Sequence, residues 1–425
     1  MFSLFIFKSN ARGIQYGIGT YISELTQSLL ALSGVFIYVV SYKNNDCKEF
    51  SVKTISDQFT EITIPSPLFP SAHSNTFDKR YASSVVRLLS EPIPENGEVV
   101  FQINYIDDLS IAVKLKEFFD HPVISVVHFA QWQQLFEGNR KRLAGLNIDQ
   151  PSNNIEFTLS QEREMYKVSD HIVSVTSYMK DFLVNEYAIN PEKITVIHNG
   201  LDNSKYRSVS EEERINLRKK LGFGKDETII LFSGRIDPCK GIIFLIEAFE
   251  EACKHNPDLR LVLLGQGSIQ DCQRKLQSSF GKVTYTGFLP KDVVTSFYNV
   301  ADIGIVPSVY DHCPYTVLEM MANRIPLIVS RINGLDEMLD DNQSLFVDPV
   351  ISQEGDISFN IKKLSDAILT LALDNNLRNE LATRAYKMLT ERFASSRMAE
   401  GMKSLFLTLI RSYNMITEYE KIERR

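Results

Sequence analysis

The chain has 425 residues, too many for one comfortable hydrophobic core, so its length favours about two or three domains. Hydrophobic residues make up 44% and charged residues 23%, a globular composition that excludes extensive disorder. The formal net charge of −7 argues against nucleic acid as the main partner, because phosphate backbones attract basic proteins.

The N-terminal segment MFSLFIFKSN predicts a strand over Phe2–Lys8. Its lysine follows the apolar run, whereas a secretory signal peptide places its basic residues first. No stretch of the sequence reaches the roughly 18 to 20 uninterrupted apolar residues of a membrane helix. The five cysteines show no CxxC spacing, so neither a zinc site nor a disulfide framework is indicated. We therefore expect a soluble protein of the reducing cytoplasm.

Gly17 and Gly19 lie where the loop after the first strand turns into a helix. Glycines at such a junction let the backbone approach a ligand closely. The spacing is not the dinucleotide fingerprint GxGxxG, since the third glycine would fall at Ile22. A tight turn without a ligand is the alternative interpretation.

The rest of the first half alternates apolar strands with helices, apart from a weakly patterned polar region that reaches Pro70. His128 follows the strand Val123–Val127 directly. Ligands in open α/β sheets bind beyond the carboxyl ends of strands, so His128 is either a ligand contact or a structural histidine. The predicted elements are the strands Val35–Ser41, Val99–Ile103, Val123–Val127, His171–Val175 and Ile194–His198, and the helices Ser83–Leu89, Asn154–Lys167 and Ser177–Glu186.

The basic cluster Arg140–Arg142 either assists contact with an anionic membrane surface or forms a solvated loop. The polar segment Asp202–Glu213 contains SVSEEER, a helix start with a capping serine. We place the linker between two domains in this segment.

The second half shows a regular α/β alternation, which predicts a parallel sheet wound on both faces. Two open α/β domains joined by a linker produce a cleft, the default place for a site. The predicted strands are Thr228–Phe232, Leu259–Leu264, Val283–Thr286, Ile303–Val306 and Pro326–Val329, and the predicted helices are Gly241–Cys253, Ile269–Gln277, Val293–Asn299, Tyr315–Ala322, Ile361–Leu373, Leu377–Phe393 and a last one from Ser395.

The stretch Pro307–Ile328 carries two acids, Asp311 before a helix and Glu319 inside it. A helix N-terminus after a buried strand suits a phosphate, because its N–H groups are unpaired and carry partial positive charge. The two acids could then hold the hydroxyls of an attached sugar or ribose. An ordinary surface helix with an acidic start is the alternative.

The loop SGRIDPCKG holds Arg235 and Lys240 between a strand end and a helix N-terminus. Two cations there suit a diphosphate leaving group, the arginine by bidentate contact and the lysine as a point charge. Basic residues also occur in loops by chance. The stretch LLGQGSIQ fails as a dinucleotide loop, because Gln270 stands at the third glycine, so Gly265 and Gly267 are interpreted as turn residues.

Four segments together resemble one family: SGRIDPCKG, TGFLPKD, ADIGIVPSVYDHCPYTVLEMMANRIPLIVS and NGLDE. In this order and spacing they are similar to the nucleotide-sugar domain of family 4 glycosyltransferases. YGIGTYISEL and IHNGLD in the first half fit the same family. The resemblance implies an α/β protein of the GT-B fold, with two Rossmann-like doubly wound domains facing across a cleft. Residues 1–205, completed by the helix 395–425, would form the acceptor domain and residues 206–394 the donor domain.

The resemblance also implies roles for individual residues. Arg235 and Lys240 match the diphosphate-binding pair. Glu319 matches the acid that holds the ribose, and Asp311 matches the acid that faces the transferred sugar. The remaining matches are Glu337 near the donor ribose and phosphate loop, His128 against the donor sugar, Gly17 and Gly19 in the glycine loop near the diphosphate and acceptor, and Thr316 as a further phosphate contact.

Three departures from the family pattern concern the same loops. Asp311 is one methylene shorter than the usual glutamate, and Asn333 replaces the first glycine of a glycine pair. Cys313 and Pro314 stand where phenylalanine and glycine are frequent, and a proline has no N–H to offer a sugar. We interpret these departures as signs of donor specificity.

The family resemblance implies retaining transfer from a nucleoside diphosphate sugar, most often a UDP-sugar, to a hydroxyl acceptor by front-face attack. Arg235, Lys240 and helix dipoles would stabilise the departing diphosphate, so neither a catalytic metal nor another cofactor is expected. The acceptor is a glycan, a lipid-linked sugar, a peptide or a small molecule, and any membrane contact would be peripheral, at the inner face. The alternatives are a noncatalytic partner of an active glycosyltransferase and a nucleotide-sugar epimerase of the GT-B type.

Overall fold

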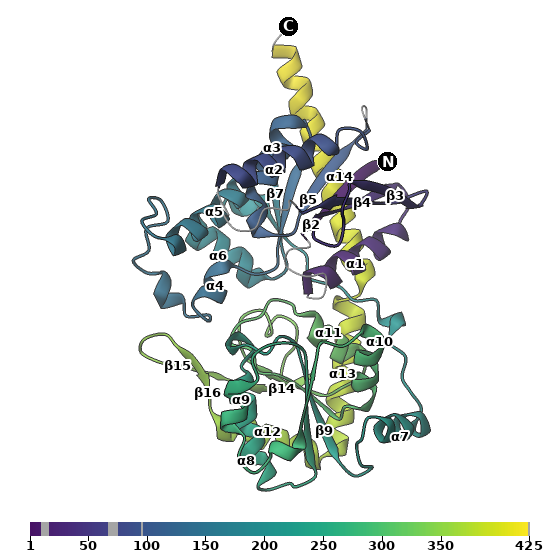
Figure 1. The fold of residues 1–425 in the computed structure, drawn as a ribbon, viewed down its shortest axis with the longest axis vertical. Coiled ribbons are helices and arrows are strands. Elements are labelled where there is room, and N and C mark those ends of the chain that lie inside the picture. Colours follow the sequence, from purple (N-terminus) through teal and green to yellow (C-terminus); the bar gives the residue numbers. More distant parts are fainter. Residues whose placement is uncertain (10–16, 67–74, 95–96, 424–425) are drawn as a thin grey trace. The chain divides into compact units, whose positions relative to one another are not determined.

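The computed structural model describes residues 1–9, 17–66, 75–94 and 97–423, which form two compact units (Figure 1). The N-terminal unit comprises residues 1–131, 147–200 and 395–425, and the C-terminal unit comprises residues 132–146 and 201–394. Residues 132–146 therefore group with the C-terminal unit, although they lie within the range 1–205 expected for the first domain. Among the described residues, no helix combines the length and apolar content needed to cross a bilayer.

The N-terminal unit is built on an eight-stranded sheet with the order β3-β4-β2-β1-β5-β6-β7-β8. Neighbouring strands are parallel except for the edge pair β3–β4. The predicted parallel sheet is confirmed for this unit. The strands are β1 (Phe2–Ser9), β2 (Val35–Asn44), β3 (Ser51–Ser56), β4 (Phe59–Pro65), β5 (Val99–Ile103), β6 (Val123–Val127), β7 (His171–Ser174) and β8 (Ile194–Val196).

Helices cover both faces of this sheet. α2, α3 and α5 share one core with the strand residues Phe5 and Phe7. Phe2, which points to the opposite face, meets Phe406 of α14 with ring centroids 5.8 Å apart, and α14 packs beside α1. The helices are α1 (Gly17–Leu30), α2 (Asn75–Leu88), α3 (Leu109–Phe118), α5 (Asn154–Val168), α6 (Ser177–Tyr187) and α14 (Ser395–Glu423).

The C-terminal unit is built on a six-stranded, wholly parallel sheet with the order β11-β10-β9-β12-β13-β14. The five strands predicted for this half agree closely with the structure, and β14 at the edge was not predicted. The strands are β9 (Thr228–Ser233), β10 (Leu259–Leu264), β11 (Val283–Gly287), β12 (Ile303–Val306), β13 (Leu327–Ser330) and β14 (Ser344–Val347).

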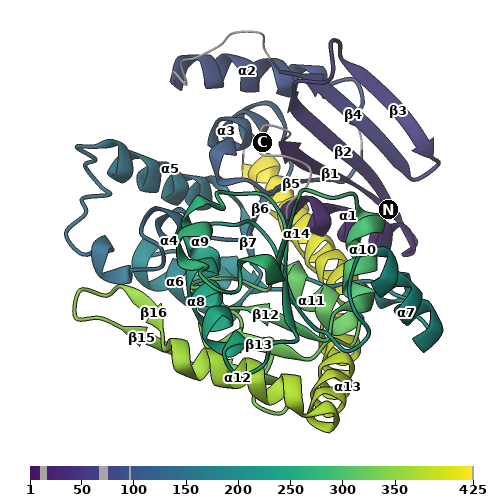
Figure 2. The same cartoon turned by 60° about the horizontal axis from the view of Figure 1, so that its bottom comes forward.

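Alternate strand residues such as Ile230 and Phe232 form one core with α8 and α12. On the opposite face α11 packs so closely that a Cβ at Gly304 would lie 2.6 Å from the Sδ of Met320. An antiparallel hairpin of β15 (Pro349–Ile351) and β16 (Ile357–Phe359) extends outward from this unit (Figure 2). The helices are α7 (Glu211–Lys220), α8 (Ile242–Cys253), α9 (Gln270–Lys275), α10 (Lys291–Val300), α11 (Tyr315–Ala322), α12 (Ile361–Leu373) and α13 (Asn375–Arg392), with α4 (Gln131–Leu135) and the short η3 (Arg140–Leu143) earlier in the chain.

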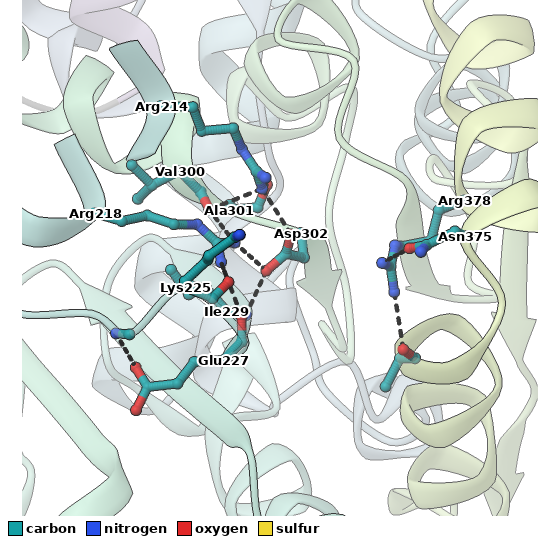
Figure 3. Close-up of polar contacts among 12 residues, drawn as sticks. Arg214, Arg218, Lys225, Glu227, Ile229, Val300, Ala301, Asp302, Asn375 and Arg378 are labelled. Carbon is teal, nitrogen blue, oxygen red and sulfur yellow. Dashed lines mark hydrogen bonds and ion pairs between the residues drawn. The ribbon is translucent and has the colours of Figure 1, made fainter. Parts of the chain in front are cut away.

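The segment that joins the units begins its helix as the sequence predicts. Ser210 caps α7 by accepting from the Glu213 N–H at 3.2 Å, and the Glu213 carboxylate accepts from the Ser210 N–H at 2.8 Å. Two arginines on the same face of α7, Arg214 and Arg218, then both bind the Asp302 carboxylate (Figure 3). Asp302 also accepts from the Ile229 N–H at 2.7 Å, so α7 is fixed to the starts of β9 and β12.

The elements predicted from the sequence are incomplete at the β3–β4 edge of the N-terminal sheet. The strand after Val35 continues to Asn44, and β3 and β4 lie in the region that shows no pattern in the sequence. β3 is exposed along its whole length, so it lacks the apolar alternation by which a strand is recognised. The predicted helix Ser83–Leu89 covers only the second half of α2, and α3 was not predicted.

Candidate functional site

The candidate residues of the C-terminal unit gather where its parallel strands end. Arg235 and Lys240 follow β9, Asp311 follows β12 and Glu337 follows β13, while Glu319 lies in α11. Parallel strands bring such loops to one edge of the sheet, which is where open α/β folds bind ligands. The loops are the structural basis of the candidate site.

Lys240 and Asp311 form an ion pair, with Nζ 2.6 Å from Oδ2. The side chains are only 22% and 13% exposed, so this pair is partly desolvated. Ser308 Oγ also donates to Asp311 Oδ2 at 3.2 Å, and the His312 N–H donates to Oδ1 at 3.2 Å. The acid and the cation are therefore held by a set of hydrogen bonds before any ligand is bound.

Arg235 is held more loosely. Its side chain is 41% exposed, and the guanidinium lies 3.3 Å from Asp237 Oδ2. Asp237 is also committed to capping the turn η6 (Pro238–Lys240), where it accepts from the Lys240 N–H at 3.2 Å. Exposed ion pairs of this kind contribute little free energy, so an incoming anion can compete for Arg235 at low cost.

The loops after β9 and β12 pack backbone against backbone at Gly241. Its φ is +66°, and a Cβ there would lie 1.8 Å from the carbonyl oxygen of Pro307. No side chain fits this position, because the close approach and the left-handed backbone both require glycine. Gly265 and Gly267 also have positive φ, in the loop after β10.

Glu319 receives hydrogen bonds from two tyrosines. The Tyr298 hydroxyl donates to Oε2 at 2.8 Å, and the Tyr206 hydroxyl donates to Oε1 at 3.4 Å. Burial, and then the Glu319 charge, raise the pKa of Tyr298 well above its ordinary value, so its hydroxyl remains a donor. Neither tyrosine could be identified from the sequence, because both contacts depend on how separate elements pack in the fold.

Cys313 and Pro314, which together form one of the departures from the family pattern, directly precede α11. Cys313 is fully buried and has a φ of +47°, a left-handed backbone for a residue that is not glycine. Pro314 is the N-cap of α11, and Thr316 lies half-buried in the first turn. Cys313 thus keeps the backbone shape that a glycine would adopt, but adds a side chain that points into the core.

The segment Arg331–Glu337 follows a strand and its sequence predicts a strand-to-helix junction, but it forms a turn instead. The chain forms consecutive turns over residues 333–338. At Gly334 φ is +100°, and a Cβ would lie 2.2 Å from the Asp311 carbonyl oxygen and 3.1 Å from His312 Nδ1. This turn packs directly on the loop that carries Asp311, which leaves no room for a helix start.

Three candidate residues belong to the N-terminal unit. His128 follows β6, and its ring meets that of Tyr21 edge-on with centroids 4.6 Å apart. Its Nε2 is buried and has no hydrogen-bond partner among the described residues. Burial lowers the pKa of His128 to about 3, so the ring is neutral near pH 7. Gly17 and Gly19 lie in the first turn of α1, and residues 10–16 of the preceding loop are outside the described residues.

The basic cluster Arg140–Arg142 is engaged within the C-terminal unit. Lys141 Nζ donates to the Gln353 carbonyl oxygen at 2.7 Å, and Arg142 lies 3.0 Å from Asp356 Oδ1. Both partners belong to the turn of the β15–β16 hairpin. Of the two interpretations from the sequence, these contacts favour the loop over a membrane-binding patch.

Family models match both halves of the chain. The model for glycosyltransferase family 4 matches residues 16–205, and the model for glycosyl transferases group 1 matches residues 213–388. An uncharacterized glycosyltransferase of Methanocaldococcus jannaschii is 34% identical over 176 residues, which is 40% of this chain and 45% of that protein. The chain spans about half the length of the curated relatives it matches.

Solved structures of low sequence identity share the fold over nearly the whole chain. Sucrose-phosphate synthase from Thermosynechococcus elongatus matches with a TM-score of 0.74 at 18% identity, over 97% of this chain and 100% of that one. HepE from Anabaena, in complex with UDP-glucose, matches with a TM-score of 0.69 at 14% identity, over 96% and 100% of the two chains.

Proposed function

The chain belongs to the family 4 glycosyltransferases and has the GT-B fold, and from this we propose that it transfers a sugar from a nucleoside diphosphate sugar to a hydroxyl acceptor. The proposed donor is a UDP-sugar, and HepE, which shares the fold, was solved with UDP-glucose. The proposed location is the reducing cytoplasm, because the five cysteines show no spacing typical of a disulfide framework.

The observation that carries the proposal is the arrangement of Arg235, Lys240 and Asp311 at the carboxyl ends of β9 and β12. A departing diphosphate develops negative charge, and fixed cations aimed at that charge are usually the largest single catalytic contribution. Lys240 has three N–H donors, so it can keep Asp311 and still bind a phosphate oxygen. Arg235 can exchange its exposed pair for a bidentate contact.

The acids would hold the rest of the donor. In the proposal Glu319, oriented by Tyr298 and Tyr206, accepts from the ribose hydroxyls, and Thr316 and the first turn of α11 approach the phosphates. Asp311 meets a hydroxyl of the transferred sugar while it orients Lys240. The Asp311 side chain, shorter than that of a glutamate, accepts hydrogen bonds from both Lys240 and Ser308.

We propose retention of the anomeric configuration by front-face attack, with a phosphate oxygen of the donor accepting the proton of the acceptor. The cations of the chain take the role of a metal in this scheme. In this proposal His128 would lie against the donor sugar as a neutral ring, Gly17 and Gly19 near the diphosphate and acceptor, and Glu337 near the donor ribose and phosphate loop. The acceptor remains one of the four classes named from the sequence.

The first experiment is a thermal-shift screen of UDP-, GDP- and ADP-sugars, each at many times its expected dissociation constant. A UDP-sugar should raise the melting temperature most, and NMR of the product formed with a panel of acceptors should show a retained anomeric configuration. Tight binding without transfer would favour the noncatalytic partner. Conversion of the donor alone to an epimer would favour the epimerase.

Arg235→Ala tests the mechanism. It should lower turnover about 10²-fold or more, as expected for the loss of one preorganised donor, without changing the melting temperature. Arg260→Ala is the matched control, because Arg260 lies near the start of β10 and pairs with Glu227 at 2.6 Å. Equal turnover in the Arg235→Ala variant and the wild type would refute the proposed role of the cation.

A further inference from the structure

Residues 132–146, here called the excursion, come from the N-terminal half of the sequence but belong to the C-terminal unit. Both ends of the excursion are fixed by carboxylates of α5. Glu162 accepts from the Gln131 N–H at 3.1 and 3.2 Å, and Glu156 accepts from the Asn147 N–H at 3.0 Å. The excursion is therefore a defined part of the fold.

The middle of the excursion binds the turn of the β15–β16 hairpin. Asn139 Nδ2 donates to Asp356 Oδ1 at 2.7 Å and to the Glu354 carbonyl oxygen at 3.1 Å. Lys141 and Arg142 add the contacts with the same turn described above. None of these groups is among the candidate site residues.

The start of the excursion makes a different contact. Gln133 Oε1 lies 2.8 Å from His312 Nε2, and the two residues are only 2% and 5% exposed. A glutamine oxygen can only accept, so the proton is on Nε2 of His312 and Nδ1 is the unprotonated nitrogen of a neutral ring. His312 Nδ1 faces the turn at Gly334.

His312 lies among the charged groups of the candidate site. Burial lowers the pKa of His312 to about 4; the charges of Asp311 and Glu337 act in the opposite direction, and Lys240 acts in the same direction as burial. The His312 N–H also donates to Asp311 Oδ1. The His312 ring anchors the backbone that carries this N–H, so displacement of the ring would shift the donor that holds the Asp311 carboxylate.

We propose that Gln133, acting through His312, is a positioning residue for the Lys240–Asp311 pair. The inference rests on the proposed function, since it assumes that Lys240 binds the diphosphate of the donor. A segment of the N-terminal half of the sequence thus sets the geometry of the diphosphate site in the C-terminal unit. Preorganised charge of this kind is effective only when its supporting contacts hold it in place.

The test measures the affinity of the full chain for inorganic pyrophosphate by calorimetry. Gln133→Ala and His312→Ala should each weaken binding about fivefold, the scale of one lost buried hydrogen bond. The double variant should be no weaker than His312→Ala alone, because Gln133 acts only through the ring. Asn139→Ala, which loosens the excursion without touching His312, should bind like the wild type.

The ¹⁵N chemical shifts of the His312 ring provide a second measurement, assigned with the His312→Ala variant. The wild type and Asn139→Ala should show the Nε2–H form, and Gln133→Ala should lose that preference. Equal weakening by Asn139→Ala, additive losses in the double variant or an unchanged ring signal in Gln133→Ala would each overturn the inference. A wild type that binds neither pyrophosphate nor any nucleotide sugar would overturn the proposed function as well.

Discussion

The two units present the same kind of sheet edge with different chemistry. In the C-terminal unit the loops after the strands hold a cation–anion pair, and the following helix α11 adds a carboxylate with two tyrosine donors. In the N-terminal unit the residues directly after β5 and β6 are Asn104 and His128, an amide and a neutral imidazole. The fold supplies the edge, and the residues placed there decide whether it suits phosphates or uncharged hydroxyls.

The largest expected effect is on the closely packed loops of the C-terminal unit. Gly241→Ala would place a Cβ 1.8 Å from the Pro307 carbonyl oxygen and force a left-handed backbone on alanine. We expect a loss of about 3 kcal/mol or more in the free energy of unfolding, because backbone atoms on both sides must move. Urea unfolding followed by circular dichroism measures it.

Gly17→Ala is the matched control in the N-terminal unit. A Cβ at Gly17 would meet nothing within 4 Å among the described residues, so the same change should leave the unfolding free energy nearly unaltered. Equal losses in the two variants would show that close backbone packing does not distinguish the two edges.

Next in size is Tyr298→Phe, which removes the shorter of the two hydrogen bonds to Glu319. We expect donor affinity to fall about tenfold, since a hydrogen bond to a charged group contributes roughly 1.5 to 3 kcal/mol. Tyr285→Phe is the control, because its exposed hydroxyl makes only a 3.4 Å contact with the Gly267 carbonyl oxygen. Calorimetric titration with the donor measures both affinities. Equal affinities of the two variants would contradict this expectation.

The smallest effect concerns pH and His128. Its folded-state pKa is about 3, below the ordinary 6.5, so the unfolded chain binds a proton that the folded chain does not. The contribution of neutral His128 to the free energy of unfolding is fully present above pH 6.5 and is lost as pH falls towards 3. His128→Phe should therefore show a smaller drop in melting temperature from pH 7.5 to 5 than the wild type. His255→Phe is the control. The His255 side chain is 64% exposed, so this change should leave the drop in melting temperature as large as in the wild type.

The sequence predicted the C-terminal unit well because each of its central strands is a short apolar run bounded by turn residues. Arg235, Lys240 and Asp311 could be expected together, since parallel strands end at one edge. Their pairing could not, because the sequence does not reveal that the shorter acid would meet the lysine. The hydrogen bond between Tyr298 and Glu319 likewise depends on how α10 and α11 pack.

Local pattern was least informative where long-range contacts decide the structure. The partner of Gln133 lies in α11's preceding loop, and the partner of Asn139 lies in a hairpin whose short strands carry no apolar alternation. The turn at Glu337 also escaped prediction, because its shape follows from contact with the Asp311 loop rather than from its own residues.

The excursion has a consequence for exchanging parts between related transferases. A chimera joined at residue 200 would take His312 and Asp356 from one parent and their partners, Gln133 and Asn139, from the other. A C-terminal unit transplanted in this way, or expressed alone as residues 201–394, would lack the side chains that contact His312 and Asp356. Recombination that preserves the C-terminal unit must therefore carry residues 132–146 along with it.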